Sequence, residues 1–232
     1  MAAAPSRGNR FAASDEPASG ELRLQRLAHA DVEHFHRQYA DPAIAALCCW
    51  PKFAGADAWH DWLDAIQAAP EHALFGIWHR QQGFIGCAGL VLHDGLGFFH
   101  YWLGRDFRAQ GHGTRTGLAL LAFAREHWGL RACYAKVFAS NHVSRRSLGK
   151  IGFHDTGVPI TSPAAHEEQL LRWPSNRHDA ADEARRLFAA LEADVHVADR
   201  PSDNSPPPDV LHLAETAASP FRPMTFEGAK TP

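Results

Sequence analysis

The chain has 232 residues, of which 45% are hydrophobic and 21% charged, and its formal net charge is -3. This hydrophobic content suffices for one sizeable core with appendages, and the small net charge excludes a uniformly basic or acidic protein. The sequence contains no run of 18 or more apolar residues and does not begin with a charged stretch followed by an apolar one. We therefore expect neither a membrane partner nor a secretory signal peptide.

The N-terminal part begins with a segment of biased composition. Residues 1–20 are rich in Ala, Ser, Gly and Pro, so we expect them to be flexible. Two arginines in this segment leave a transit peptide as an alternative. Hydrophobic alternation over 21–27 then predicts the first strand.

Two helices are expected next. Asp31 can cap a helix with an apolar face, and Asp41-Pro42 would end it. A second helix is predicted over 58–68 because Trp59, Trp62, Leu63 and Ile66 recur at helical spacing. That spacing also assigns most of these aromatic side chains to the core.

Three antiparallel strands are predicted over 74–79, 84–92 and 98–103, with turns at 81–83 and 93–97. A further strand over 168–173 would close the sheet. The element order indicates an α+β fold, a mixed α/β sandwich with a central, mostly antiparallel sheet flanked by helices.

A glycine-rich turn follows the strand at 98–103 and precedes a helix. Its sequence is Arg108-Ala109-Gln110-Gly111-His112-Gly113-Thr114. Free backbone N–H groups and the positive end of a helix dipole make such a turn an anion site, and phosphate is its usual ligand. The spacing matches neither Gly-x-x-x-x-Gly-Lys-Ser/Thr nor Gly-x-Gly-x-x-Gly. An ordinary turn with two glycines is the alternative.

The segment that contains this turn is strongly basic. Residues 105–150 hold nine Lys and Arg against two Asp and Glu, a net charge of +7. A local basic block in a near-neutral protein indicates a polyanionic partner. The same segment contains a strand candidate at 133–138 and a short helix that Ser140 or Asn141 would cap and Gly152 would end.

These motifs together resemble the core of the GCN5-related N-acetyltransferases, the GNAT superfamily. The matching residues are Arg108-x-x-Gly111-x-Gly113, Asn141-x-x-Ser144, Leu148-x-x-x-Gly152-Phe153 and Tyr101-Trp102-Leu103-Gly104. The last three are similar to the branch that contains the N-terminal acetyltransferases of ribosomal proteins. The resemblance implies an acetyltransferase domain over 21–173 in which two neighbouring strands splay apart.

The resemblance also implies acetyl-CoA as co-substrate and no metal. Its diphosphate would be held by Arg108 and by the backbone of Ala109, Gln110, Gly111, His112, Gly113 and Thr114. Its pantetheine arm would pair with the edge formed by Tyr101, Trp102 and Leu103, and Asn141 would bond it from the other wall. Arg146 would reach the adenosine phosphate. A plain helix cap is the alternative for Asn141, and a solvated surface is the alternative for Arg146.

The catalytic residues are less completely matched. The resemblance assigns the departing thiolate to the hydroxyl of Ser144, which could instead bond the backbone in the first turn of its helix. Glutamates that many relatives carry are replaced here by Phe98 or Phe99 and by Thr156. His100 is the nearest alternative base, and proton release through water to bulk solvent is another. His93 and Asp94 are weaker candidates.

The acceptor cleft of the family lies near the first helices, where we expect Phe35 and Trp50 to line it. Aromatic walls favour a protein or peptide N-terminus, or another apolar amine, as acceptor. A small amine (an amino acid, a polyamine or an antibiotic) and a non-catalytic acyl-CoA-binding module remain open. Nucleic acid is disfavoured because the basic block lacks interleaved aromatics and one coenzyme explains its charge.

The C-terminal part is expected to be an appendage. Residues 174–199 would form a linker and an amphipathic helix, and 200–232 a disordered, acidic, Pro-rich tail. The helix would dock on the catalytic body or on a second subunit, so both a monomer and a homodimer are open. The four cysteines and sixteen histidines show no metal-ligand spacing, and free thiols favour the cytoplasm.

Overall fold

The computed structural model describes residues 17–48, 51–161, 167–175, 179–191, 193 and 195–198. The predictions made for residues 1–16, for Trp50 and for the tail at 200–232 lie outside the described residues. Ala18–Ser19 falls in the segment expected to be flexible, but it forms a short strand, β1, that pairs with the next strand. No helix in the described part of the chain is both long and apolar enough to cross a membrane.

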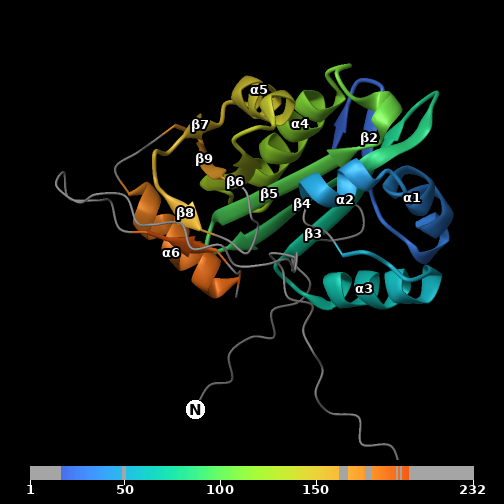
Figure 1. Cartoon of the computed structure of the whole chain (residues 1–232), viewed down its shortest axis with the longest axis horizontal. Coiled ribbons are helices and arrows are strands. Elements are labelled where there is room, and N and C mark those ends of the chain that lie inside the picture. Colours follow the sequence, from blue (N-terminus) through green and yellow to red (C-terminus); the bar gives the residue numbers. More distant parts are fainter. Residues whose placement is uncertain are drawn as a thin grey trace, which may run out of the picture.

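One eight-stranded sheet forms the centre of the molecule, in the order β1-β2-β3-β4-β5-β6-β9-β7 (Figure 1). Its main strands are β2 Leu22–Arg26, β3 His72–His79, β4 Gly83–His93, β5 Leu96–Leu103, β6 Ala132–Phe138 and β9 Glu168–Trp173. The short strand β7 spans His154–Asp155, and β8 Ile160–Thr161 pairs with β10 His196–Val197 in a separate ribbon. Every described pair in the main sheet is antiparallel except β5 with β6. The predicted fold class is confirmed.

Helices cover both faces of this sheet (Figure 1). They are α1 Val32–Tyr39, α2 Pro42–Cys48, α3 Ala56–Ala68, α4 His112–His127, α5 His142–Ile151 and α6 Ala180–Ala190, with short 3-10 turns at His29–Asp31 and Arg105–Phe107. Apolar side chains of α4 and α5 pack on one face. On the opposite face α1, α2 and α3 share one core cluster and α6 lies in another.

Side-chain alternation along β5 shows how one strand serves all three clusters. Phe99 lies in the core under α4 and α5. Phe98 points to the other face, where it packs with α6, and Trp102 packs with α1 to α3. Because successive strand residues face opposite sides, His100 shares the face of Phe98 and Trp102. Tyr101 and Leu103 share the face of α4 and α5.

The parallel strands β5 and β6 stay together for only three residue pairs. Leu96 pairs with Ala132 and Phe98 with Tyr134, but no further pair follows. Strand β5 continues to Leu103 and β6 continues to Phe138, so their C-terminal halves diverge. This opening is the splayed pair that the resemblance predicts, and it places unpaired strand edges beside the turn that leads into α4.

The helix α2 was not predicted. Pro42 was interpreted only as the end of the preceding helix, but it also begins the next one, where its missing N–H costs nothing. Asp41 caps this helix, because its Oδ1 accepts a hydrogen bond of 3.0 Å from the backbone N–H of Ala43. The consequence for the site is that α2 ends beside the opening between β5 and β6.

Candidate active site

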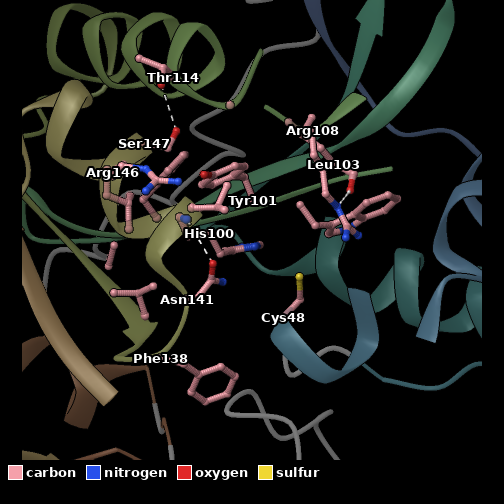
Figure 2. Close-up of a pocket in the computed structure, with 18 of the residues that line it drawn as sticks. Cys48, His100, Tyr101, Leu103, Arg108, Thr114, Phe138, Asn141, Arg146 and Ser147 are labelled. Atoms are coloured by element: carbon pink, nitrogen blue, oxygen red, sulfur yellow. Dashed lines mark hydrogen bonds between the residues drawn. The ribbon is translucent and has the colours of Figure 1, made fainter. Parts of the chain in front are cut away.

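A cavity of about 510 Å³ lies where β5 and β6 separate (Figure 2). Its walls are the two diverging strands, the turn before α4, the first turns of α5, the end of α2 and the start of β9. The predicted site residues that line it are His100, Tyr101, Trp102, Leu103, Arg108, Ala109, Gly111, His112, Gly113, Thr114, Asn141, Ser144 and Arg146. Residues that are far apart in sequence therefore meet around one hollow.

The turn before α4 has the backbone geometry of an anion cradle. Gly111 is the N-cap of the helix and has φ +79°, a conformation that favours glycine. Ala109 also has a positive φ, +61°, which is strained for a residue with a Cβ. No described side chain caps the helix, and its first N–H groups have no acceptor within the helix. Together with the helix dipole, these N–H groups fit a diphosphate.

Arg108 has protein partners for its guanidinium. Its Nε donates to the carbonyl oxygen of Leu103 at 3.1 Å, and its Nη2 donates to Asp41 Oδ2 at 3.1 Å. The side chain thus ties the turn to the end of β5, where Figure 2 shows it beside Leu103, and to the cap of α2. Arg108 also lines the cavity, so its direct contact with the coenzyme stays a prediction beside this positioning of the turn.

Two other side chains of the turn have contacts within the protein. Gln110 Nε2 donates to the carbonyl oxygen of Asp106 at 2.6 Å, and Gln110 does not line the cavity. His112 is buried, and its Nδ1 lies 2.9 Å from Arg115 Nη2. Burial, followed by the charges of Arg115 and His79, lowers the pKa of His112. These residues would therefore meet a diphosphate through backbone N–H groups.

Hydroxyl groups of α4 and α5 face one another across the upper part of the cavity. The Oγ1 of Thr114 lies 3.0 Å from the Oγ of Ser147 (Figure 2). This hydrogen bond joins the first turn of α4 to the second turn of α5. Arg146 lines the cavity beside them, whereas Arg145 donates from Nη1 to the carbonyl oxygen of Ala139 at 3.2 Å.

The first turn of α5 places Asn141 and Ser144 on the cavity wall. Asn141 is the helix cap: its Oδ1 accepts a hydrogen bond of 3.1 Å from the backbone N–H of Ser144. The cap and the predicted contact with the pantetheine arm are compatible, because the side-chain amide also carries two N–H donors. Ser144 lines the cavity as well, and its predicted role toward a departing thiolate stays a prediction.

His100 occupies the middle of the cavity wall between Tyr101 and Asn141 in Figure 2. Its ring lies close to Gly89 of β4, where a Cβ would come within 2.3 Å of the His100 Nε2. Burial, and secondarily His72, lowers the pKa of His100 to about 3. A group with so low a pKa is a weak acceptor for a proton from an alkylammonium ion.

The prediction for Phe35 needs correction. Its side chain is 0% exposed and lies at the centre of an aromatic cluster with Tyr39, Trp59 and Trp102. The helical spacing that predicted a core role for Trp59 applies equally to this residue of α1. Phe35 therefore supports the wall from behind and does not face the cavity.

Several lining residues were not predicted. Ile44 and Cys48 reach the cavity from α2, and Figure 2 shows the sulfur of Cys48 directed toward its centre. Lys136 on β6 and Glu168 on β9 line it as an ion pair. In the sequence, the only sign of this ion pair was the position of Lys136 in the middle of an apolar strand. Glu168 lies 32 positions later, and no local pattern connects the two residues.

The comparisons with known proteins agree with this geometry. Residues 21–154 match the family model described as Acetyltransferase (GNAT) domain. The sheet with its splayed strand pair and the anion cradle define the class of acyl-CoA-dependent N-acetyltransferases. The chain belongs to the GNAT acetyltransferase family. No curated protein sequence matches the chain.

Solved structures show the same fold at low sequence identity. RimJ of Mycobacterium smegmatis, in complex with CoA-disulfide, is 19% identical with TM-score 0.57 and covers 73% of this chain and 88% of its own. The ribosomal-protein-S5-alanine acetyltransferase of Vibrio fischeri is 13% identical with TM-score 0.58, and the match covers 71% and 97%. Spermidine N-acetyltransferase of Vibrio cholerae, in complex with CoA and spermine, is 14% identical with TM-score 0.59 and covers 66% and 94%.

Proposed function

We propose that this protein transfers an acetyl group from acetyl-CoA to a primary amine, with a protein or peptide N-terminus as the acceptor. The observation that carries the proposal is the cavity at the splayed strands, which the uncapped start of α4 borders directly. An anion held by the turn would place its attached chain between β5 and β6. The opposite face of the sheet then receives the acceptor.

The proposed reaction needs a stabilised carbonyl oxygen, a proton for the departing sulfur and an acceptor for the amine's proton. Acetyl-CoA supplies a thioester whose carbonyl carbon the acceptor nitrogen attacks while the bond to sulfur breaks. A backbone N–H at the β5 edge, near Trp102 or Leu103, stabilises the charge on the carbonyl oxygen, which is typically worth about 3 kcal/mol. Ser144 donates its hydroxyl proton to the departing sulfur and regains one from solvent. We assign the amine's proton to water, because the pKa of His100 is too low for this task.

The choice of acceptor rests on two kinds of support. RimJ and the ribosomal-protein acetyltransferase share the fold with this chain. The cavity wall also carries the Asn141-x-x-Ser144 motif that resembles this branch. We further propose a cytoplasmic location, supported by free thiols at Cys48, Cys87 and Cys133 in the described part of the chain.

A small amine is the second candidate, since spermidine N-acetyltransferase has the same fold at comparable similarity. The deciding experiment measures acetyl-CoA consumption with peptides bearing a free N-terminus, free amino acids, polyamines and no acceptor. Turnover that depends on the peptide supports the proposal, and turnover with polyamines alone moves the function to the second candidate. Tight CoA binding without any amine-dependent turnover would overturn catalysis and indicate a non-catalytic binding module.

A further inference from the structure

A buried ion pair lies in the cavity wall, where neither the diphosphate turn nor the proposed chemistry uses it. Lys136 Nζ lies 3.0 Å from Glu168 Oε1, and the two side chains are 8% and 5% exposed. Both residues line the cavity. Burying two charges costs free energy that their mutual attraction does not reliably repay, so a pair in this position calls for a role beyond stability.

The pair lies on the acceptor side of the sheet. Lys136 alternates with Tyr134 on β6, and Tyr134 packs in the cluster of α6. Glu168 alternates in the same way with Leu170 on β9. Both side chains therefore face away from α4 and α5, and they share their face of the sheet with His100. A coenzyme arm that enters from the α4 side would present its thioester toward this face.

The charges around the cavity limit the kind of amine that can approach. Glu168 is the only carboxylate among the described lining residues, and it already has Lys136 as a partner. Four basic side chains line the same cavity: Arg108, Lys136, Arg146 and Lys150. Among the described lining residues, a polycation such as a polyamine would therefore find no set of acids to receive its several charges.

We infer that the Lys136–Glu168 pair recognises the head group of an α-amino acyl acceptor. Glu168 accepts a hydrogen bond from the acceptor's amine, and Lys136 donates one to the oxygen of the adjacent carbonyl or carboxylate. An ionised carboxylate has about four acceptor sites and a lysine ammonium has three donors, so their mutual contact does not by itself saturate either group. This inference rests on the proposed acetyl transfer and adds residues that select its substrate.

The recognition chemistry is shared by peptide N-termini and free amino acids, which both place an oxygen next to the α-carbon of the amine. A simple alkylamine of similar size lacks that oxygen. The pair should therefore discriminate alaninamide from sec-butylamine. Comparing wild type with variants at one pH removes the effect of the different pKa values of these two amines.

The test measures kcat and KM for alaninamide, a tetrapeptide, free alanine, sec-butylamine and spermidine, together with the dissociation constant for CoA. Lys136→Met should lower kcat/KM for the first three by about 10- to 100-fold, as expected for losing a hydrogen bond to a charged group. Its kcat/KM for sec-butylamine and its affinity for CoA should change less than about twofold. Glu168→Gln should raise KM for all amines. The tetrapeptide and alanine arms distinguish the two sources of the head group.

Two further variants separate recognition from structural support. The double variant Lys136→Glu/Glu168→Lys keeps an ion pair but exchanges its ends, so a structural pair would retain activity and a recognition pair would lose its preference for α-amines. Glu183→Gln breaks the Arg172–Glu183 pair (2.8 Å), which also involves β9 but lies outside the cavity lining. This control should lower stability and leave the acceptor KM unchanged.

The outcomes distinguish this inference from the proposed function. Amine-dependent turnover in wild type with unchanged acceptor KM in Lys136→Met and Glu168→Gln overturns the inference and leaves acetyl transfer standing. A wild-type preference for spermidine also overturns it. Binding of CoA without turnover on any amine removes both. If the single variants do not fold, the exchanged double variant carries the test.

Discussion

At the scale of single residues, His100 shows how burial decides the use of a titratable group. The sequence placed a histidine on the strand that leads to the anion turn, where a base would be useful. In the structure the ring lies close to Gly89, and burial lowers the pKa of His100 to about 3. We therefore expect His100 to be neutral near pH 7, which is why we propose water rather than this ring as the acceptor of the amine's proton.

The pH dependence of the free energy of unfolding should reveal the lowered pKa of His100. An unfolded histidine has a pKa near 6.5, so between about pH 3 and 6.5 the unfolded state binds more protons than the folded one. Above pH 6.5 His100 is neutral in both states and adds no pH dependence, and below that the cost of keeping it neutral in the folded state grows as the pH falls toward 3. The free energy of unfolding should fall by up to about 1.4 kcal/mol per pH unit from this group.

Urea unfolding at several pH values between 4.5 and 7.5 measures this slope. His100→Asn should reduce the slope, and the same substitution at His154, an exposed residue of β7, is the matched control. Equal slopes in wild type and His100→Asn would contradict the assignment.

Ser144 and Ser147 offer a second comparison at this scale. Both line the cavity from α5, one helical turn apart, but Ser147 is bonded to Thr114 at 3.0 Å. Ser144→Ala should lower kcat more than 10-fold with little change in CoA affinity, because we propose that its hydroxyl protonates the departing sulfur. Ser147→Ala should weaken CoA binding instead, because it loosens the start of α4. Steady-state kinetics and calorimetry of CoA binding measure both, and an unchanged kcat in Ser144→Ala would remove that residue from the mechanism.

At the scale of elements, the turn into α4 combines a backbone conformation with a charge requirement. Gly111 has a positive φ, and a Cβ there would have open space around it. Gly111→Ala and Gly111→Asp thus share a similar backbone strain, roughly 1–2 kcal/mol, and differ in charge. Gly111→Asp should abolish CoA binding because its carboxylate would meet the diphosphate, while Gly111→Ala should retain measurable affinity. Equal dissociation constants for CoA in the two variants would contradict a diphosphate at this turn.

The elements with strong periodicity were predictable from the sequence. Alternation located β2, apolar runs next to turn residues located β3 to β6 to within a few residues, and helical spacing located α1, α3 and α6. Four short strands were not predicted: β1, β7, β8 and β10. Each has two residues and forms only because another strand pairs with it, so no local pattern could predict it. The helix α2 was missed because Asp41-Pro42 both ends one helix and begins another.

In the candidate site, too, features set by local sequence were predictable and features set by distant partners were not. Contiguous motifs, such as the turn at 108–114 and the cap at Asn141, were predictable because a local backbone conformation requires those residue types. The direction of individual side chains was not. Arg108 turns to Leu103 and Asp41, and Phe35 turns into the core, because tertiary partners decide between a ligand and a protein contact.

At the scale of the whole molecule, the C-terminal helix completes the sheet's second face. The sequence left open whether this helix docks on the catalytic body or on another subunit. In the structure α6 packs on the body, with Leu187 and Phe188 buried against Phe98 and its neighbours. Tyr134 donates a hydrogen bond of 2.8 Å to Glu183, and Arg172 lies 2.8 Å from the same carboxylate. The helix thereby supports the half of β5 and β6 that stays paired, next to the point where the strands separate.

Truncating α6 in the core should therefore destabilise the whole domain. Leu187 is 0% exposed, so Leu187→Ala should lower the free energy of unfolding by about 2–5 kcal/mol through lost burial and a residual cavity. Arg186→Ala, at an exposed position of the same helix, should change it by less than about 0.5 kcal/mol. Urea unfolding followed by both circular dichroism and tryptophan fluorescence measures the two variants.

The two probes also test whether the helix belongs to the cooperative unit. If α6 supports the paired half of β5 and β6, both signals should shift together, because the helix cannot unfold without exposing Phe98 and the strand pairing beneath it. CoA affinity of Leu187→Ala at 25 °C should stay near the wild-type value as long as the variant is folded, since α6 does not line the cavity. An early helical transition that leaves the fluorescence and CoA binding intact would show instead that α6 is an independent appendage.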